Sequence, residues 1–202
     1  MNVVPKARLR SRLRRKRILI PVGTILALVV VSVILRLTDL LVLVGPGGVS
    51  NSPTIPPCNP RTLAEGLTYH FRDPHRGELV VIHARGHIGG PITADPHARD
   101  LNLTKRVVGI PGDTVVSRNE RVFVNGRKAD DIPTAPFLTT HLRPKEYYVL
   151  GDNRSYSEDS RDFGPVPRNA IFARLVLTYW PLGRFGTPGY NKKLVPPGEI
   201  AC

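Results

Sequence analysis

The sequence lacks the short motifs that mark many hydrolases and metalloenzymes. It contains no G-x-S-x-G elbow, no phosphate-binding Walker loop, no H-E-x-x-H helix and no C-x-x-C pair. Its six histidines are scattered, and none has the context of a Ser-His-Asp triad. These absences leave serine, lysine and carboxylate side chains as candidates for chemistry, and we expect neither a cofactor nor a metal.

Cysteine is scarce as well, because Cys58 and Cys202 are the only two in 202 residues. An exported domain would allow them to pair, but nothing in the sequence places them near each other. A disulfide and two free thiols therefore both remain open. Neither cysteine has neighbouring ligands at the spacing of a zinc site.

Acidic residues are missing from the first 38 positions, which contain nine of the 29 lysines and arginines. The apolar run over residues 18–35 has no charge, and as a helix it would extend roughly 27 Å, close to the thickness of a bilayer core. A cleaved signal peptide would have a shorter apolar core and a small-residue cleavage site. We therefore expect a plasma-membrane protein with a cytoplasmic basic tail (1–17), one transmembrane anchor (18–39) and an extracytoplasmic domain (40–202). Because most of the excess positive charge precedes the apolar run, we expect no nucleic-acid partner.

The rest of the chain is predicted to be mostly β. Short apolar segments bounded by Gly, Pro, Asn or Asp are typical of strands. The predicted strands cover residues 40–44, 79–82, 107–108, 114–116, 122–124, 147–150 and 173–179. Asn119-Glu120 and Asn125-Gly126 predict tight turns. We expect a short helix within residues 62–67 and long loops over 85–103 and from Gly183 onward.

Two segments concentrate polar groups in a way that suits catalysis. Lys105 stands at the head of an apolar strand, and burial would lower the pKa of its amine. A neutral amine can take the proton of a serine hydroxyl, but an outward-facing lysine would be solvated and inert, and periodicity alone favours the outward one. The segment 151–161, with ten polar or charged residues after its glycine, is either a solvated loop or a set of partners for buried polar groups around a site.

These two segments resemble the motifs of type I signal peptidases, which are membrane-bound Ser/Lys proteases that remove signal peptides. The strongest matches are Lys-Arg-Val-Val-Gly-Ile-Pro-Gly-Asp at 105–113 and Gly-Asp-Asn-Arg-x-x-Ser-x-Asp-Ser-Arg at 151–161; weaker ones are at 76–81, 124–126 and 180–181. The resemblance covers most of residues 45–185. It implies a mostly β, antiparallel catalytic domain behind one N-terminal transmembrane helix, with residues 114–146 as a small inserted hairpin region.

The resemblance also implies roles for individual residues. Ser50 would be the nucleophile, with its backbone N–H in the oxyanion hole, and Lys105 would be the general base. Ser157 would orient the lysine amine. The other supporting positions implied are Arg106 paired with Asp152, and Asp159 paired with Arg161.

The nucleophile motif departs from the family pattern, in which Ser-Met precedes x-Pro-Thr-Leu. Alignment on Pro53-Thr54-Ile55 without a gap selects Ser50 and puts Asn51 in place of Met, whereas a two-residue deletion would select Ser52 instead. The family Met lies near a shallow apolar pocket for small side chains. The polar Asn51 therefore keeps two alternatives open, a related protease with a dedicated substrate and an inactive homologue that binds signal peptides.

The partners that the resemblance implies follow from the same activity. They are exported preproteins with small residues before the cleavage site, the lipid bilayer, and the secretion machinery.

Overall fold

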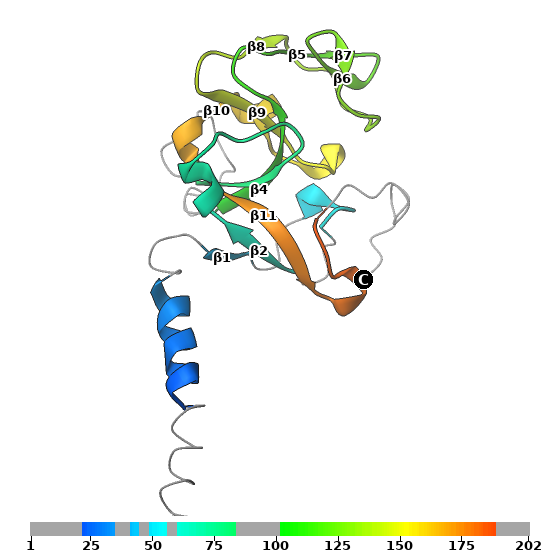
Figure 1. Cartoon of the computed structure of the whole chain (residues 1–202). Coiled ribbons are helices and arrows are strands. Elements are labelled where there is room, and N and C mark those ends of the chain that lie inside the picture. Colours follow the sequence, from blue (N-terminus) through cyan, green and yellow to red (C-terminus); the bar gives the residue numbers. More distant parts are fainter. Residues whose placement is uncertain (1–21, 35–40, 45–48, 56–59, 84–101, 189–202) are drawn as a thin grey trace, which may run out of the picture. The chain divides into compact units, whose positions relative to one another are not determined.

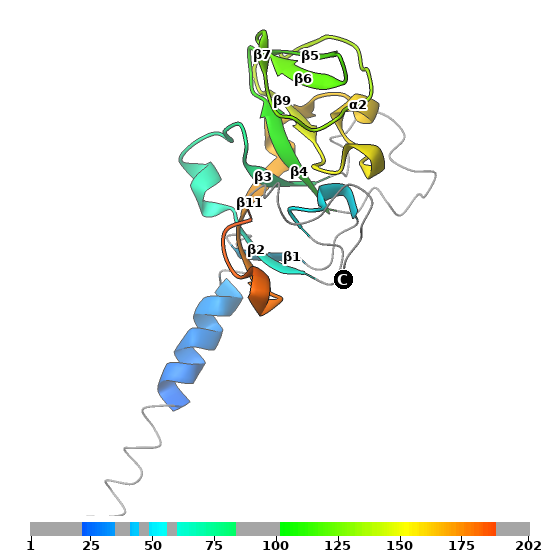
Figure 2. The same cartoon turned by 90° about the vertical axis from the view of Figure 1, so that its right-hand side faces the viewer.

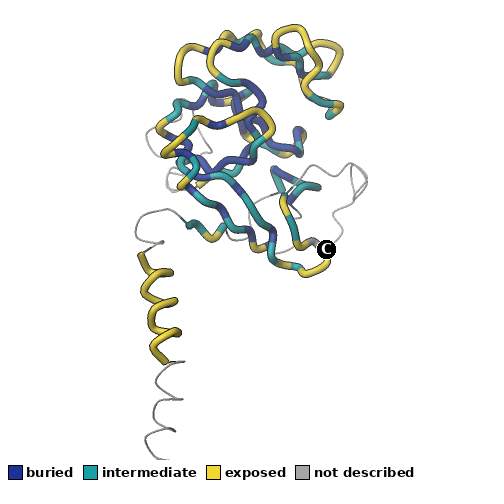
Figure 3. Tube along the Cα trace, viewed as in Figure 1, coloured by how far each residue is buried: buried dark blue, intermediate teal, exposed yellow. Residues whose placement is uncertain are grey.

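The structure is a computed structural model that describes residues 22–34, 41–44, 49–55, 60–83 and 102–188. The chain divides into two compact units, residues 1–40 and residues 41–202. In the first unit, residues 22–34 form a helix whose side chains are exposed (Figure 3). None of the helices formed by the described residues has the length and apolar content of a membrane span. The predicted tail (1–17) and both ends of the predicted anchor (18–21 and 35–39) lie outside the described residues.

Two antiparallel sheets make up the second unit (Figure 1). The larger has the strand order β1-β2-β11-β3-β4-β9-β10, and the smaller has the order β7-β6-β5-β8. The larger sheet consists of β1 Leu41–Val44, β2 Arg61–Glu65, β3 Leu79–His83, β4 Asn102–Gly109, β9 Glu146–Leu150, β10 Val166–Pro167 and β11 Ile171–Trp180. The smaller consists of β5 Thr114–Arg118, β6 Arg121–Val124, β7 Arg127–Lys128 and β8 Thr140–His141. All of these strand pairs are antiparallel, in agreement with the predicted fold class.

Short helices connect the strands at the places where the chain turns. They are η1 Val49–Asn51, η2 Leu67–His70, η4 Arg154–Tyr156, α2 Ser160–Phe163, η5 Arg168–Ala170 and η6 Leu182–Arg184. Two of them, η1 and η4, belong to segments that the sequence analysis assigned to the site. Figure 2 shows η1 beside β4 and close to the turn that follows β9.

Successive side chains of the central strands pack into different hydrophobic cores on the two faces of the larger sheet. In β3, Val80 and Ile82 belong to one core, and Leu79 and Val81 belong to another. Successive side chains of a strand face opposite sides, so a strand covered on both faces is apolar throughout. β9 divides its side chains in the same way between the first core and a third core shared with β5 and β6.

The smaller sheet is inserted between β4 and β9, which pair directly with each other. The range 114–146, expected to be a small inserted hairpin region, contains the four strands β5 to β8, and its last residue already begins β9. The turns predicted at Asn119-Glu120 and Asn125-Gly126 are both present. All four residues have positive φ, as the tight two-residue turns of hairpins require.

The helix expected within residues 62–67 is wrong. β2 covers Arg61–Glu65, and the 3-10 helix η2 begins only at Leu67. Thr62 and Ala64 are buried and their neighbours less so, which is the period of a strand. β2 pairs with both β1 and β11, so sheet pairing outweighs a weak local helical preference.

The loop predictions are wrong at their edges. Asn102 and Leu103 begin β4 and pair with His83 and Ile82, while residues 84–101 lie outside the described part of the chain. At the other end, Gly186 forms a bridge with Thr178 of β11, so the chain after Gly183 turns back onto the sheet. In both places, pairing with a strand extends the described structure beyond the apolar run.

Candidate active site

Lys105 lies in β4, opposite Val80 of β3, and its side chain points into the protein. The residue is 3% exposed. Burial lowers the pKa of its amine from 10.5 to about 8; the nearby Asp159 carboxylate opposes this fall and the Arg161 guanidinium adds to it. Lys105 Nζ donates a hydrogen bond to Ser157 Oγ at 3.0 Å. The structure therefore holds a lysine amine away from water and directs it at a neutral hydroxyl.

Asp159 organises the segment that carries Ser157. Its carboxylate is fully buried and accepts from the backbone N–H of Gly151 at 3.0 Å. Arg161 donates to the same carboxylate through Nε at 2.8 Å and Nη2 at 2.9 Å, and Nη2 also donates to the carbonyl of Ser157 at 3.0 Å. These contacts close the turn after β9 around Asp159, and this fixes the hydroxyl that meets Lys105.

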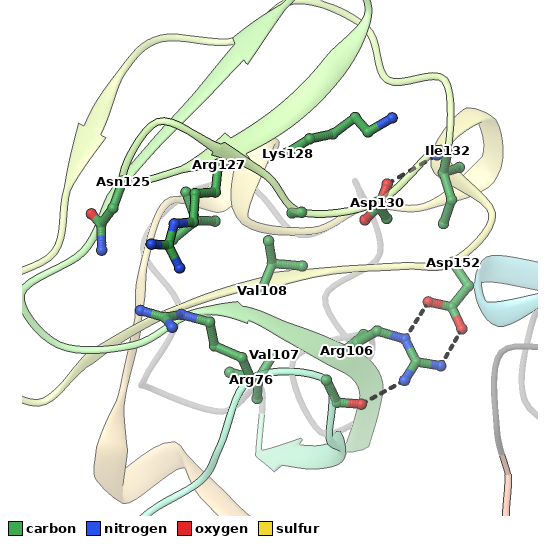
Figure 4. Close-up of a pocket in the computed structure, with 13 residues that line it drawn as sticks. Arg76, Arg106, Val107, Val108, Asn125, Arg127, Lys128, Asp130, Ile132 and Asp152 are labelled. Carbon is green, nitrogen blue, oxygen red and sulfur yellow. Dashed lines mark hydrogen bonds and ion pairs between the residues drawn. The ribbon is translucent and has the colours of Figure 1, made fainter.

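Arg106 and Asp152 form a bidentate ion pair next to the site (Figure 4). Arg106 Nε lies 2.7 Å from Asp152 Oδ1, and Nη2 lies 2.6 Å from Oδ2. Thr54 Oγ1 donates to the same carboxylate at 2.6 Å. Asp152 is buried, so charge-assisted bonds at this position join three parts of the chain: β4, the turn after β9, and the segment after η1.

Ser50 lies in η1, and its backbone packs against the same turn. Its carbonyl accepts from the N–H of Asn153 at 2.9 Å. A Cβ added to Gly151 would lie 2.5 Å from Ser50 O and 2.2 Å from Ser157 Oγ. Ser50 O and Ser157 Oγ are therefore close to each other, because both lie within 2.5 Å of the same point. The backbone of Ser50 is therefore beside the serine that holds the Lys105 amine.

The two candidate nucleophiles, Ser50 and Ser52, are both partly exposed. Among the hydrogen bonds of the described residues, none joins the amine of Lys105 to the hydroxyl of either serine. Catalytic hydrogen bonds are often long in the absence of substrate and shorten when it binds. The choice between the two serines thus rests on the alignment of Pro53-Thr54-Ile55 and on the position of the Ser50 backbone.

Comparison with known protein families matches residues 17–180 to the family described as signal peptidase, peptidase S26. The chain belongs to this family. Individual members of the family are moderately similar to it. Signal peptidase I of Leptolyngbya laminosa is 34% identical over 136 residues, which cover 65% of this chain and 65% of that protein. Probable signal peptidase I-2 of Synechocystis sp. is 34% identical over 142 residues, covering 68% and 62%.

A plant protein is also similar to this member of the S26 family. Thylakoidal processing peptidase 1, chloroplastic, of Arabidopsis thaliana is 31% identical over 150 residues, covering 70% of this chain and 43% of that protein. The matched segment thus spans less than two thirds of each of these three relatives. A solved structure of a signal peptidase I from Enterococcus faecalis V583 aligns at 24% identity with a TM-score of 0.41, covering 52% of this chain and 97% of its own.

Asn51, which differs from the signal peptidase pattern, has its amide inside the protein. The residue is 4% exposed. Its Nδ2 donates to the carbonyl of Thr104 at 2.6 Å, and its Oδ1 accepts from the N–H of Asp152 across a longer 3.5 Å. The amide is thus occupied by backbone groups and does not present a polar surface to a small apolar side chain.

Arg154 is a residue of the signal peptidase motif to which the sequence analysis gave no role. It is 5% exposed and donates to the carbonyl of Gly151 at 2.9 Å. Its guanidinium also donates to Thr134 Oγ1 and Asp130 Oδ2, both at 2.6 Å. Thr134 and Asp130 belong to the inserted region, and nothing in the sequence indicates that this region contacts the motif. The only sign in the sequence that Arg154 has a role is its position, as a charged residue in the middle of the matched segment 151–161.

Two cavities flank the candidate site. One, of about 670 Å³, lies between β4 and the inserted sheet and reaches the Arg106–Asp152 pair (Figure 4). The other, of about 660 Å³, reaches Ser157. Neither of these two cavities is lined by Ser50 or Lys105. In the described part of the chain, no cluster of His, Cys, Asp and Glu is arranged to hold a metal ion. Cys58 and Cys202 lie outside that part.

Proposed function

We propose that this protein is a membrane-bound serine endopeptidase that removes signal peptides from exported preproteins, with Ser50 as nucleophile and Lys105 as general base. One observation carries the proposal: the Lys105 amine is buried, its pKa is lowered to about 8, and its direct partner is the hydroxyl of Ser157. A lysine on a solvated strand face would remain charged at neutral pH. A lysine in this environment can act as a base.

The chemistry follows from the groups around that amine. One N–H of neutral Lys105 donates to Ser157, which leaves the nitrogen lone pair for the proton of Ser50. Ser50 Oγ attacks the scissile carbonyl carbon while its proton moves to Lys105. The negative charge on the carbonyl oxygen is stabilised by the backbone N–H of Ser50. The ammonium then protonates the leaving nitrogen, the C–N bond breaks, and a water molecule deprotonated by the same amine hydrolyses the acyl-enzyme.

The reaction takes place at the membrane in this proposal. The basic, acid-free tail (1–17) and the apolar run behind it support a single-pass protein with a cytoplasmic N-terminus. The peptidase domain (40–202) then lies on the outer side of the plasma membrane, where signal peptides emerge. Its substrates are preproteins with small residues at the third and first positions before the cut, delivered through the lipid bilayer by the secretion machinery.

Cleavage of a purified preprotein by the full chain in detergent tests the proposal. We expect release of the mature protein with its new N-terminus at the small-x-small site, and loss of cleavage when the first position before the cut carries a bulky residue. Ser50→Ala, prepared in parallel, is the control for contaminating proteases. Cleavage that is unchanged by this substitution and by Ser52→Ala would contradict the proposed mechanism.

The two alternatives are separated from the proposal by a serine-reactive acylating inhibitor. A protein that is acylated but leaves preproteins uncut is a Ser/Lys protease with a dedicated substrate. A protein that is neither acylated nor active, yet retains a signal peptide on a column, is an inactive binding homologue.

A further inference from the structure

We infer that Asn51 is a positioning residue, whose side-chain amide sets the placement of Ser50 relative to Lys105. The inference rests on the proposed function, because it concerns the same serine–lysine pair. Asn51 directly follows the nucleophile in the chain, and Thr104 directly precedes the base. Asn51 Nδ2 donates to Thr104 O at 2.6 Å, so this one bond links the neighbours of both catalytic residues.

The chemistry of its partners fixes the orientation of the amide. Thr104 O can only accept a hydrogen bond, so the NH₂ group must face it, and the amide oxygen faces the N–H of Asp152 at 3.5 Å. Because Asn51 is 4% exposed, water is poorly placed to replace either partner. A carboxylate at this position would direct an anionic oxygen at the Thr104 carbonyl, and an aliphatic side chain would leave that carbonyl without this donor.

The contact with β4 differs from the other attachments of the nucleophile segment. Ser50 O is held by Asn153 N, and Thr54 is held by Asp152, so these bonds tie the segment to the turn after β9. Asn51 ties it to the strand that carries Lys105. Loss of the amide would remove the direct bond between the nucleophile segment and β4 and leave only the indirect link through Thr54, Asp152 and Arg106, so Ser50 would be held less firmly relative to the base. The chemical step is therefore expected to suffer more than substrate binding or folding.

The test compares Asn51→Leu, which has the shape of asparagine without its polar atoms, and Asn51→Asp, which lacks the donor. The full chain in detergent is assayed with a purified preprotein and with a serine-reactive acylating inhibitor. We expect kcat and the acylation rate to fall together by at least ~10-fold in both variants, with little change in KM, because small misplacements of reacting groups are costly. In Asn51→Asp, the added negative charge also moves the midpoint of the pH–rate profile upward.

Asn125→Asp is the matched control, since it makes the same chemical change in the inserted sheet. The Asn125 amide bridges Thr114 N at 2.9 Å and Asp113 Oδ1 at 2.8 Å. We expect this variant to lose thermal stability but to keep its kcat, its acylation rate and its pH midpoint. A merely structural role for Asn51 would give its variants the same behaviour.

The outcomes separate the inference from the proposed function. Folded Asn51→Leu and Asn51→Asp proteins with kcat and acylation rate within twofold of the parent overturn the inference and leave the proposed function intact. A parent protein that neither cleaves nor becomes acylated overturns the proposed function itself. If both variants unfold, Asn51→Gln keeps the amide but shifts it by one methylene: the same loss of kcat supports the inference, and an unchanged kcat contradicts it.

Discussion

The pKa of the Lys105 amine determines whether a serine–lysine pair can work near neutral pH. An ordinary lysine is almost fully protonated there and cannot accept a proton. Burial in β4 lowers the pKa of Lys105 to about 8, while the Asp159 carboxylate works against this fall. The pKa of Lys105 thus depends on two things, the burial of its amine and the charge of the nearby Asp159 carboxylate. Arg161 forms hydrogen bonds with that carboxylate and its own positive charge helps to lower the pKa of Lys105.

The pH dependence of cleavage follows from this pKa. In the proposed mechanism only neutral Lys105 accepts the proton, so kcat/KM should rise with pH and level off above the pKa of about 8. Between pH 7 and pH 9 we expect an increase of about tenfold, since the neutral fraction of such a group grows from about a tenth to about nine tenths. The rate profile of the preprotein assay measures this. An activity that is constant from pH 6 to 9 would exclude a titrating lysine as the base.

Substitution of Lys105 separates loss of catalysis from loss of fold. The unfolded lysine keeps its proton up to about pH 10.5, and the folded one releases it near 8, so the unfolded state binds more protons in that window and wild-type stability increases with pH there. Below pH 8 the folded state bears the cost of a buried charge, on the order of 3 kcal/mol for this shift. Lys105→Met should therefore be inactive at every pH and yet melt at a higher temperature than the parent at pH 7, in differential scanning calorimetry. Inactivity together with a lower melting temperature would point to a damaged fold.

Among the elements, η1, β4 and the turn after β9 converge at Gly151. Ser50 is brought in by η1, Lys105 by β4 and Ser157 by the turn. Gly151 has no side chain, and this allows Ser50 O and Ser157 Oγ to approach the same point. Its N–H is also held by Asp159 at 3.0 Å. Position 151 has to be a glycine because η1 and the turn after β9 approach each other too closely there to leave room for a side chain.

Gly151→Ala tests this convergence. The new methyl group would lie 2.2 Å from Ser157 Oγ and 2.5 Å from Ser50 O, so one of the two segments must move. We expect kcat to fall by roughly 10²-fold, as for other small displacements of reacting groups. Gly126→Ala is the control: it forces alanine to a φ of +78° but meets nothing within 4 Å, so it should cost stability without affecting kcat. Equal activities in the two variants would mean that the junction tolerates a side chain.

Sequence patterns predicted the elements that have short-range signals. The apolar run at 79–82 became β3, and the Asn-containing turns became two-residue hairpins. β2 was missed because Ala64 and Glu65 are weak strand formers, and their strand is formed by pairing with β1 and β11. Pairing with His83 likewise extends β4 back to Asn102. These features depend on residues far away in the chain.

The candidate site was less predictable from sequence patterns than the strands and turns were. Periodicity alone favoured a solvated Lys105, and only the resemblance to a family indicated an inward one. The pairing of Arg106 with Asp152 also came from that resemblance, and the structure brings the two together. The contact between Asn51 and Thr104 could not be predicted, because it joins positions 53 apart through a backbone carbonyl. No sequence pattern records such a partner.

For the whole molecule, the distribution of charge predicts the topology. Nine basic residues and no acidic ones occupy positions 1–38, and basic residues flanking a span favour the cytoplasmic side. A protease added outside intact spheroplasts should therefore digest the domain after residue 45 and spare the tail. Immunoblotting with antibodies against each end measures the result. Digestion of the domain only after lysis would contradict the topology and, with it, access to exported preproteins.

The most direct test of the central claim is to locate the acyl group after reaction with a serine-reactive acylating inhibitor, by mass spectrometry of the full chain and its peptides. We predict one acyl group per chain, on Ser50, with labelling lost in Lys105→Ala and nearly unchanged in Ser52→Ala. Ser50→Ala should also lower cleavage by at least ~10³-fold, the scale of a lost serine nucleophile. An acyl group on Ser52, or full labelling of Ser50 in the absence of Lys105, would contradict the account.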